Sequence, residues 1–383
     1  MLFFIPKFIF RLKYLYYFYG MTTTHLTHIG KAQEMSQIGN DTIDLIVTSP
    51  PYPMIEMWDE IMGRQNPLIT TALKNNDANT AFELMHQELD KIWSECYRVL
   101  KEGGIACINI GDATRTINNN FCLYTNHARI INYCLKIGFT NLPNIIWRKQ
   151  TNAPNKFMGS GMLPAGAYVT LEHEWILIFR KGGKRQFKTE KDKVERRSSS
   201  FFWEERNIWF SDIWDLKGTK QRIDNLSRDR SAAFPFALPY RLINMYSVKG
   251  DTVLDPFMGT GTTAIAAIVA GRNSIGYEID SVFKDVIHNN IKNLNINILN
   301  NIIKNRLENH KKFIKDRSKD KTKNEIKHFN HVLSLPVITS QETGIEFSFI
   351  DKIIQKPDLI EIAYTIPISK VSELPFKTIG SLF

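Results

Sequence analysis

The sequence is poor in cysteine, and its histidines are scattered. Four cysteines occur among 383 residues, and no two of them have CxxC spacing: Cys96, Cys107, Cys122 and Cys134. This pattern argues against a disulfide framework and a zinc site, and it fits a reducing compartment such as the cytoplasm. The nine histidines form no ligand motif, so we expect no metal.

Long apolar runs are also missing, because charges interrupt the most hydrophobic stretch. Residues 2–19 are crowded with Phe and Tyr but contain Lys7, Arg11 and Lys13. A membrane helix needs about 20 apolar residues, and a signal peptide carries its charges ahead of its apolar part. We therefore expect no membrane partner. We also expect residues 1–20 to be a dispensable extension, with Met21 as the natural start.

Acidic residues are in the minority. The chain has 49 Lys and Arg against 39 Asp and Glu, a formal net charge of +10. A basic surplus fits a nucleic-acid partner, because neutralising phosphates dominates such affinity. Charge alone leaves a nonspecific basic surface equally open. The length predicts one large domain with inserts, or two domains.

One motif has the features of a nucleotide-binding loop. Residues 252–254 predict a buried strand, and residues 255–261 follow as Asp-Pro-Phe-Met-Gly-Thr-Gly. A helix is expected over residues 262–270, ended by Gly271. A second strand, 274–277, leads to Glu278, about 20 residues beyond the first strand, where a carboxylate meets ribose hydroxyls. A nicotinamide dehydrogenase or a purely structural turn would also fit this pattern.

A second motif, roughly 200 residues earlier in the chain, offers two hydrogen-bond acceptors on a stiff turn. The predicted strand 43–47 leads to Ser49, Pro50, Pro51 and Tyr52. The Ser49 hydroxyl and the Pro50 carbonyl would accept hydrogens from an exocyclic amine, and Tyr52 offers a flat face for stacking. Alone, the segment could be an ordinary rigid turn. In an open α/β sheet both loops would reach one crevice at the carboxyl ends of the strands.

Together, and in this order, the motifs resemble those of bacterial amino-methyltransferases that act on DNA, in the β-class arrangement with the catalytic motif first. The resemblance runs from about Ile43 to about Asn290, with a gap near 183–230. Further segments that resemble the family are 98–104, 146–149, 174–182, 234–239 and 246–250.

The resemblance implies an α/β fold with a doubly wound, mostly parallel, Rossmann-like sheet. It implies sequence-specific methylation of double-stranded DNA by S-adenosyl-L-methionine, with base flipping and no covalent intermediate. Ser49 and Pro50 would hold the target amine, within a motif completed by Pro51, and Tyr52 would stack on the base. The residues expected around the cofactor are Phe234, Pro235, Asp255, Phe257, Gly259, Thr260, Gly261 and Glu278.

Serine at the first motif position favours cytosine N4 as the acceptor, with adenine N6 as the alternative. Methylation at cytosine C5 is disfavoured, because no cysteine follows a proline. A nicotinamide-dependent oxidoreductase and a DNA-binding protein without catalysis are weaker alternatives. The setting implied is a restriction–modification system with a separately acting endonuclease, or a solitary modification enzyme. The sequence does not predict the oligomeric state or the recognition site.

We expect five segments. Residues 1–20 precede a target-base half, 21–182, and a target-recognition insert, 183–231. The S-adenosylmethionine-binding half, 232–298, leads to an extension of unassigned role, 299–383. The insert, expected to be rich in loops, interleaves aromatic residues with candidate DNA contacts: Lys184, Arg185, Arg196, Arg197 and Arg206. It could instead be a surface insert with its own aromatic core. Residues 304–327 predict a basic helix that follows the duplex or faces water.

Overall fold

The computed structural model describes residues 21–149, 158–217, 234–320, 322–356 and 359–365. The proposed extension 1–20 and the end of the recognition insert, 218–231, lie outside the described residues. Within the described part, no helix combines the length and the apolar character that crossing a membrane requires.

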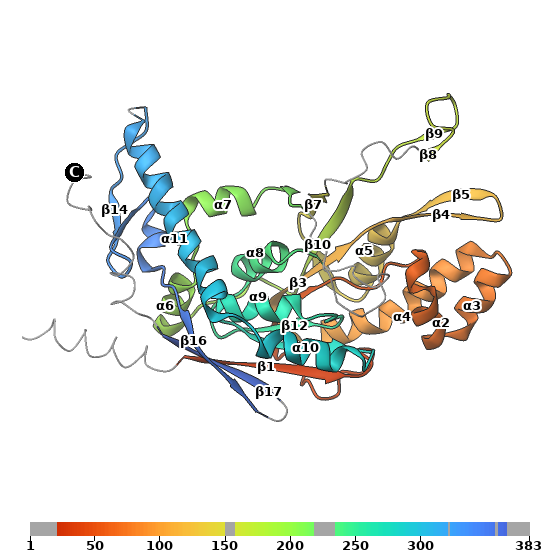
Figure 1. Ribbon diagram of the computed structural model, residues 1–383, viewed down its shortest axis with the longest axis horizontal. Helices are drawn as coiled ribbons and strands as arrows, with labels where there is room; N and C mark the ends of the chain where they lie inside the picture. The colour runs from red at the N-terminus through yellow and green to blue at the C-terminus, as the bar shows by residue number, and fades with distance from the viewer. Residues whose placement is uncertain (1–20, 150–157, 218–233, 321, 357–358, 366–383) are drawn as a thin grey trace, which may run out of the picture.

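In the described part of the chain, one sheet of eleven strands runs through the molecule (Figure 1). Its order is β11-β7-β10-β3-β2-β12-β13-β1-β17-β16, and β6 pairs with β10. The five middle strands are parallel: β3 (Leu100–Ile110), β2 (Ile43–Thr48), β12 (Thr252–Asp255), β13 (Asn273–Glu278) and β1 (Thr22–Ile29). The predicted doubly wound α/β fold is confirmed, with antiparallel strands added on both sides of this core.

Antiparallel pairing begins where β10 joins β3 and where β17 joins β1. The outer strands are β11 (Ile213–Asp215), β7 (Ile145–Arg148), β10 (His173–Lys181), β6 (Phe139–Asn141), β17 (Leu359–Thr365) and β16 (Phe349–Gln355). Among the described residues, three two-stranded sheets stand apart: β4 (Ala113–Ile117) with β5 (Asn120–Tyr124), β8 (Met158–Gly159) with β9 (Ala167–Tyr168), and β14 (His328–Asn330) with β15 (Leu335–Val337).

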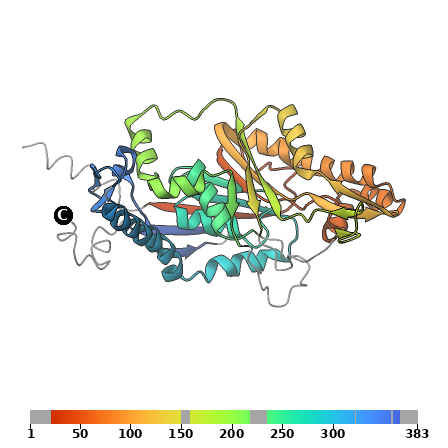
Figure 2. The same cartoon turned by 90° about the horizontal axis from the view of Figure 1, so that it is seen from above.

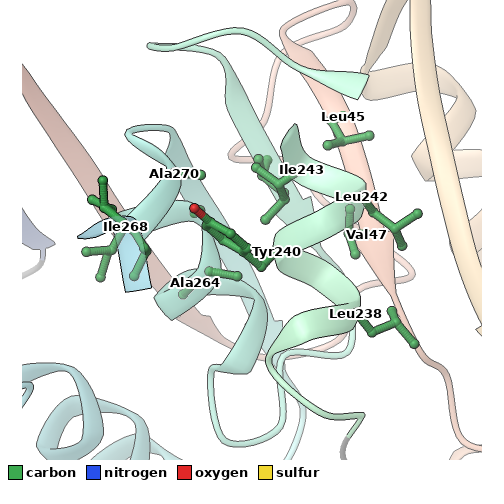
Figure 3. Close-up of a cluster of buried hydrophobic side chains, with 14 of the residues drawn as sticks. Leu45, Val47, Leu238, Tyr240, Leu242, Ile243, Ala264, Ile268 and Ala270 are labelled. Atoms are coloured by element: carbon green, nitrogen blue, oxygen red, sulfur yellow. The ribbon is translucent and has the colours of Figure 1, made fainter. Parts of the chain in front are cut away.

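The middle strands are apolar on both faces because helices cover both. All six residues of β2 are buried, as expected for a central parallel strand. Leu45 and Val47 belong to one core cluster and Ile46 to the other, since alternate side chains point to opposite faces. Figure 3 shows part of the first cluster, where Leu45 and Val47 lie beside Leu242 of helix α8.

The helices are distributed between these two cores (Figure 2). Helices α8 (Ala237–Tyr246) and α9 (Thr262–Ala270) supply the first core, together with α10 (Phe283–Lys292) and α11 (Ile296–Lys319). Helices α4 (Ala78–Val99) and α5 (Asn126–Lys136) supply the second core. Near α4 lie α2 (Asp59–Gln65) and α3 (Pro67–Lys74), which follow the short 3-10 helix η1 (Glu56–Trp58).

The described part of the recognition insert contains regular structure, where the sequence suggested mainly loops. It holds α6 (Glu190–Ser198), α7 (Trp203–Trp209) and β11. Thr189 and Asp192 form a reciprocal capping box that starts α6. Trp209 and Trp214 are buried. Trp214 belongs to the first core cluster and lies opposite Trp147 of β7, and the Arg306 guanidinium lies 5.1 Å from the centre of the Trp209 ring, so these aromatic residues pack the insert against the main fold.

The C-terminal extension is continuous with the main fold. The basic helix expected over residues 304–327 forms part of α11, which begins earlier, at Ile296, and ends at Lys319. Helix α11 buries Leu299, Ile303 and Leu307 at a spacing of four, so one of its faces is apolar. Strand β17 pairs with β1, and the 3-10 helix η3 (Ser340–Gly344) contacts α6. Strands β16 and β17 of the extension therefore complete one edge of the central sheet.

Candidate active site

The two motif loops leave the sheet side by side. Strands β2 and β12 are parallel neighbours, with Leu45 opposite Val253 and Ile46 opposite Leu254. From β2 the sheet continues to β3, and from β12 it continues to β13. The strand order therefore continues in opposite directions from β2 and from β12. In an open parallel sheet, ligands bind at the carboxyl ends of the two strands where this reversal occurs. The predicted juxtaposition of the two motifs is present.

Asp255 ties the two loops together. Its Oδ1 accepts hydrogen bonds from Thr48 Oγ1 at 2.6 Å and from the Phe257 amide at 3.0 Å, and its Oδ2 accepts from Thr263 Oγ1 at 2.6 Å. The side chain is buried, and this burial raises the pKa of its carboxyl. Both oxygens therefore accept hydrogen bonds from the protein itself, and Asp255 fixes the end of β2 relative to the start of α9.

The glycine loop has the backbone that its sequence predicts. Gly259 and Gly261 have φ values of +52° and +88°, in the left-handed region that favours glycine. A side chain at Gly259 would meet no atom within 4 Å, so the loop borders open space there. Helix α9 begins at Thr262 and ends at Ala270, and Gly271 is its C-cap, as expected. The Thr260 carbonyl accepts a hydrogen bond from Asn290 at 3.1 Å.

Glu278 lies at the carboxyl end of β13 and faces this loop. Its Oε2 accepts a hydrogen bond from the Gly259 amide at 2.9 Å, and its Oε1 accepts one from the Asp280 amide at 2.9 Å. Burial raises the pKa of Glu278, against these two backbone hydrogen bonds. Each carboxylate oxygen has two lone-pair sites, so acceptor capacity is left for ligand hydroxyls.

Of the remaining predicted cofactor residues, Phe257 lies within the glycine loop, whereas Phe234 and Pro235 precede helix α8. Phe257 packs edge-on against Trp93, with ring centroids 5.9 Å apart. Met258 fits against Gly276, where any side chain would collide with its sulfur. Phe234 and Pro235 are buried immediately before α8, and the Pro235 carbonyl accepts from the Leu238 amide at 2.9 Å.

The amino-group motif contacts a polar cluster that the sequence reasoning missed. Tyr52 donates its hydroxyl hydrogen to Glu174 Oε2 at 2.8 Å, and the Ser49 hydroxyl lies 3.2 Å from the Tyr52 hydroxyl. Asn109 Nδ2 donates to Glu174 Oε2 at 2.7 Å and to the Tyr52 oxygen at 2.8 Å. Lys149 forms an ion pair with Glu174 Oε1. We call Ser49, Tyr52, Asn109, Lys149 and Glu174 the polar cluster.

The polar cluster draws on four neighbouring strands, β7, β10, β3 and β2. Asn109 is on β3, Glu174 is on β10, and Lys149 directly follows β7. No short sequence spacing links these residues, so a motif search cannot group them. The available signal was that Lys149 and Glu174 lie in segments already noted for resembling the family.

Tyr52 is held in its neutral, hydrogen-donating form. Burial raises its pKa well above the usual value for tyrosine, and the negative charge of Glu174 raises it further. One edge of its ring fits against Gly111, where an added Cβ would come within 2.8 Å of Tyr52 Cε2. The hydroxyl is therefore committed to the polar cluster, while the proposed stacking on a base stays a prediction.

The predicted DNA contacts fall into two groups. Lys184, Arg196, Arg197 and Arg206 are exposed. The guanidinium of Arg196 lies 4.7 Å from the ring centre of Phe187, and that of Arg206 lies 5.9 Å from the ring centre of Phe210. Arg185 instead pairs with Asp251 at 2.6 and 2.9 Å. Its guanidinium thus holds the insert to the turn before β12.

The described residues contain no group of three or more His, Cys, Asp or Glu side chains placed to hold a metal ion. All four cysteines are free, and Cys96, Cys107 and Cys134 are buried.

Residues 43–289 match the family described as DNA methylase, the N6/N4 methyltransferases. The chain is 57% identical over 274 residues to the Type II methyltransferase M.MthZI of Methanothermobacter thermautotrophicus, covering 71% of this chain and 77% of that protein. It is 51% identical over 282 residues to the Type II methyltransferase M.MjaI of Methanocaldococcus jannaschii, covering 71% of this chain and 92% of that protein.

A solved structure shares the fold. A protein of Thermus thermophilus, described as a putative DNA modification methylase and complexed with S-adenosyl-L-methionine, superimposes with a TM-score of 0.54 at 31% identity. The match covers 69% of this chain and 91% of that one.

Proposed function

Because the chain belongs to the N6/N4 DNA methylase family, we propose that it methylates the exocyclic N4 of cytosine at a specific sequence in double-stranded DNA, with S-adenosyl-L-methionine as methyl donor. The observation that carries the proposal is the juxtaposition of Ser49, on one loop, with the glycine loop on the neighbouring strand. A target amine and a nucleoside cofactor would meet at this crevice.

The glycine loop fits the cofactor. Gly259 borders open space, and the Glu278 carboxylate next to it retains acceptor capacity for ribose hydroxyls. Asp255 holds this loop against β2 through Thr48 and Thr263. Phe234, Pro235, Phe257, Thr260 and Gly261 complete the proposed binding segment. When bound, the cofactor supplies a methyl group on a sulfonium.

The residues of the first loop act on the other reactant. Ser49 Oγ and the Pro50 carbonyl accept the two amine hydrogens, which localises the nitrogen lone pair and points it at the methyl group. Pro51 keeps the turn stiff, and Tyr52 contacts the base. The target base must leave the helix, because its amine is out of reach inside the duplex. Methyl transfer would form the carbon–nitrogen bond as the carbon–sulfur bond of the donor breaks, and the nitrogen would release one proton to water during or after the transfer. Catalysis then depends on positioning and electrostatics.

DNA binding involves the insert. Lys184, Arg196, Arg197 and Arg206 are exposed cations on it, and we assign them to phosphate contacts that fix the position of the duplex. Two relatives are named Type II methyltransferases. We therefore place the protein in a restriction–modification system of the cytoplasm, beside an endonuclease that acts independently.

The test is to incubate the protein and its Ser49→Ala variant with the cofactor and genomic DNA, and to identify modified nucleosides by mass spectrometry. We expect N4-methylcytosine from the wild type. Loss of the Ser49 acceptor should slow turnover by roughly 10²- to 10³-fold, as for other hydrogen bonds that stabilise a transition state. N6-methyladenine alone would overturn the base assignment and leave the class standing. No methylated nucleoside, despite bound cofactor, would overturn the proposal.

A further inference from the structure

We infer that Glu174 is a positioning residue that sets the direction of the hydrogen bonds in the polar cluster, so that Ser49 faces the target amine as an acceptor. The inference rests on the proposed role of Ser49. Glu174 and Asn109 are 8% and 2% exposed, and their strands are neighbours in the central sheet. The geometry of the cluster is therefore held by the sheet itself.

The direction follows from what each group can donate. A carboxylate only accepts, so the hydrogen bond at 2.8 Å between Tyr52 and Glu174 must use the hydroxyl hydrogen of Tyr52. The amide of Asn109 gives one hydrogen to Glu174 at 2.7 Å and the other to the Tyr52 oxygen at 2.8 Å. The reversed orientation of this amide would set its oxygen against the carboxylate.

The Tyr52 oxygen therefore has no hydrogen left for Ser49. Across the 3.2 Å between the two hydroxyls, Ser49 must donate and Tyr52 must accept. Asn109 Nδ2 is 3.4 Å from Ser49 Oγ, but its two hydrogens already have closer partners. The lone pairs of Ser49 Oγ are left for an amine that carries two hydrogens.

Without the carboxylate, this direction is lost. Tyr52 could then donate to Ser49, and Ser49 could point its own hydrogen at the amine. Two donors would face each other there, and no hydrogen bond would form. Lys149 stabilises the arrangement from the other side, because its ammonium pairs with the second oxygen of Glu174. The effect of Glu174 should thus appear in methyl transfer and leave the binding of DNA and cofactor largely unchanged.

The experiment compares single-turnover methyl transfer in the full-length wild type, Glu174→Gln, Tyr52→Phe and the double variant. Gln at 174 keeps the shape but has a single acceptor oxygen. With that oxygen on Lys149, its NH2 group faces Tyr52 and Asn109 and cannot accept from them. Phe at 52 breaks the chain of hydrogen bonds without changing any charge. Each single variant should be slower by about 10- to 100-fold, the range seen when hydrogen-bond partners that orient metal-binding side chains are removed. The double variant should be no slower than the slower single one, because both changes interrupt one chain. Glu174→Asp should recover part of the rate.

Cofactor and DNA affinities and the melting temperature are measured on the same samples. Glu172→Gln is the matched control, because its exposed carboxylate is two residues away; its rate should equal that of the wild type. If Glu174→Gln and Tyr52→Phe keep the full rate while Ser49→Ala is inactive, the inference fails and the proposed function stands. Multiplicative losses in the double variant would also overturn it. Full activity of Ser49→Ala would instead refute the proposed role of Ser49.

Discussion

Individual residues have two kinds of role at this crevice. Asp255 connects the loops through Thr48 and Thr263, so its carboxylate is occupied by the protein. Glu278 is bound by two backbone amides and still has acceptor sites on the side of the glycine loop. The sequence placed both acids in the cofactor site, but it could not separate a structural carboxylate from one available to a ligand.

The first prediction concerns Glu278. Glu278→Gln should weaken binding of S-adenosyl-L-methionine by about 1.5–3 kcal/mol, the usual contribution of a hydrogen bond to a charged group. DNA affinity should hold, because phosphate contacts do not involve this residue. Calorimetry with the cofactor measures the first quantity and a DNA titration the second. Asp285→Asn, an exposed carboxylate on α10, is the control. Equal cofactor affinity in wild type and Glu278→Gln would remove Glu278 from the site.

The second prediction concerns pH and His25 on β1. Burial lowers the pKa of this imidazole from its usual 6.5 to about 3. Between these values the unfolded chain binds a proton that the folded chain excludes, so the free energy of unfolding falls as pH drops from 6.5 towards 3. In the neutral ring, Nε2 lies 2.9 Å from Thr23 Oγ1 and Nδ1 lies 2.8 Å from Ser274 Oγ, and both partners are in strands of the central sheet.

Urea unfolding at about pH 7.5 and about pH 4.5 checks this sign. The loss of stability on acidification should be smaller in His25→Gln than in the wild type, by on the order of 1–3 kcal/mol at about 1.36 kcal/mol per pH unit. His328→Gln, at an exposed position, should lose as much as the wild type. A loss in His25→Gln equal to that of the wild type would show that this imidazole does not couple folding to pH.

Elements with strong local signals were predictable from the sequence, and those defined by distant partners were not. Helix α9 runs from Thr262 to Ala270 as expected, because the glycine residues at both ends fix its limits. Helix α11 looked polar, and its spaced apolar residues were hidden among Lys and Arg. Asn109 and Glu174 meet only because β3 and β10 are neighbours in the sheet, which no local pattern reveals.

The third prediction tests how α7 is fixed to α11. Arg306 on α11 pairs with both oxygens of Glu205 on α7, at 2.6 and 2.8 Å, and both side chains are largely buried. Arg306→Met leaves the Glu205 carboxylate without its partner, which should cost about 3–5 kcal/mol of unfolding free energy. Urea denaturation of Arg306→Met, and of the double variant with Glu205→Gln, measures this cost.

The double variant should recover part of the loss, because no buried charge is then left unpaired. Arg64→Met breaks a comparable but exposed pair with Glu60 and should cost less than about 1 kcal/mol. Similar losses in Arg306→Met and Arg64→Met would mean that the contact between α7 and α11 adds little to stability.

At the scale of the whole molecule, the expected segments are less separate than their sequences suggest. The family match ends at residue 289, yet the first core includes Leu307, Ile350 and Ile362 from beyond it. The insert is joined to this region through Glu205 and to the turn before β12 through Arg185. An insert attached at both places holds its exposed cations in a fixed position, which fits the proposed role of these cations in orienting a duplex.

The last prediction separates the two groups of basic residues on the insert by the salt dependence of DNA binding. The logarithm of affinity falls with the logarithm of salt concentration, with a slope of about −0.9 per neutralised phosphate. Arg197→Gln removes an exposed cation, so it should weaken all DNA sequences alike and reduce the slope by about one unit. Arg185→Gln should leave the slope unchanged, because its guanidinium is paired with Asp251, and should instead lower the melting temperature. DNA titrations at several salt concentrations measure the slope, and thermal unfolding measures the melting temperature of each variant. A reduced slope in Arg185→Gln with an unchanged melting temperature would return Arg185 to the DNA-binding surface, because only a cation that meets phosphate gives that pair of results.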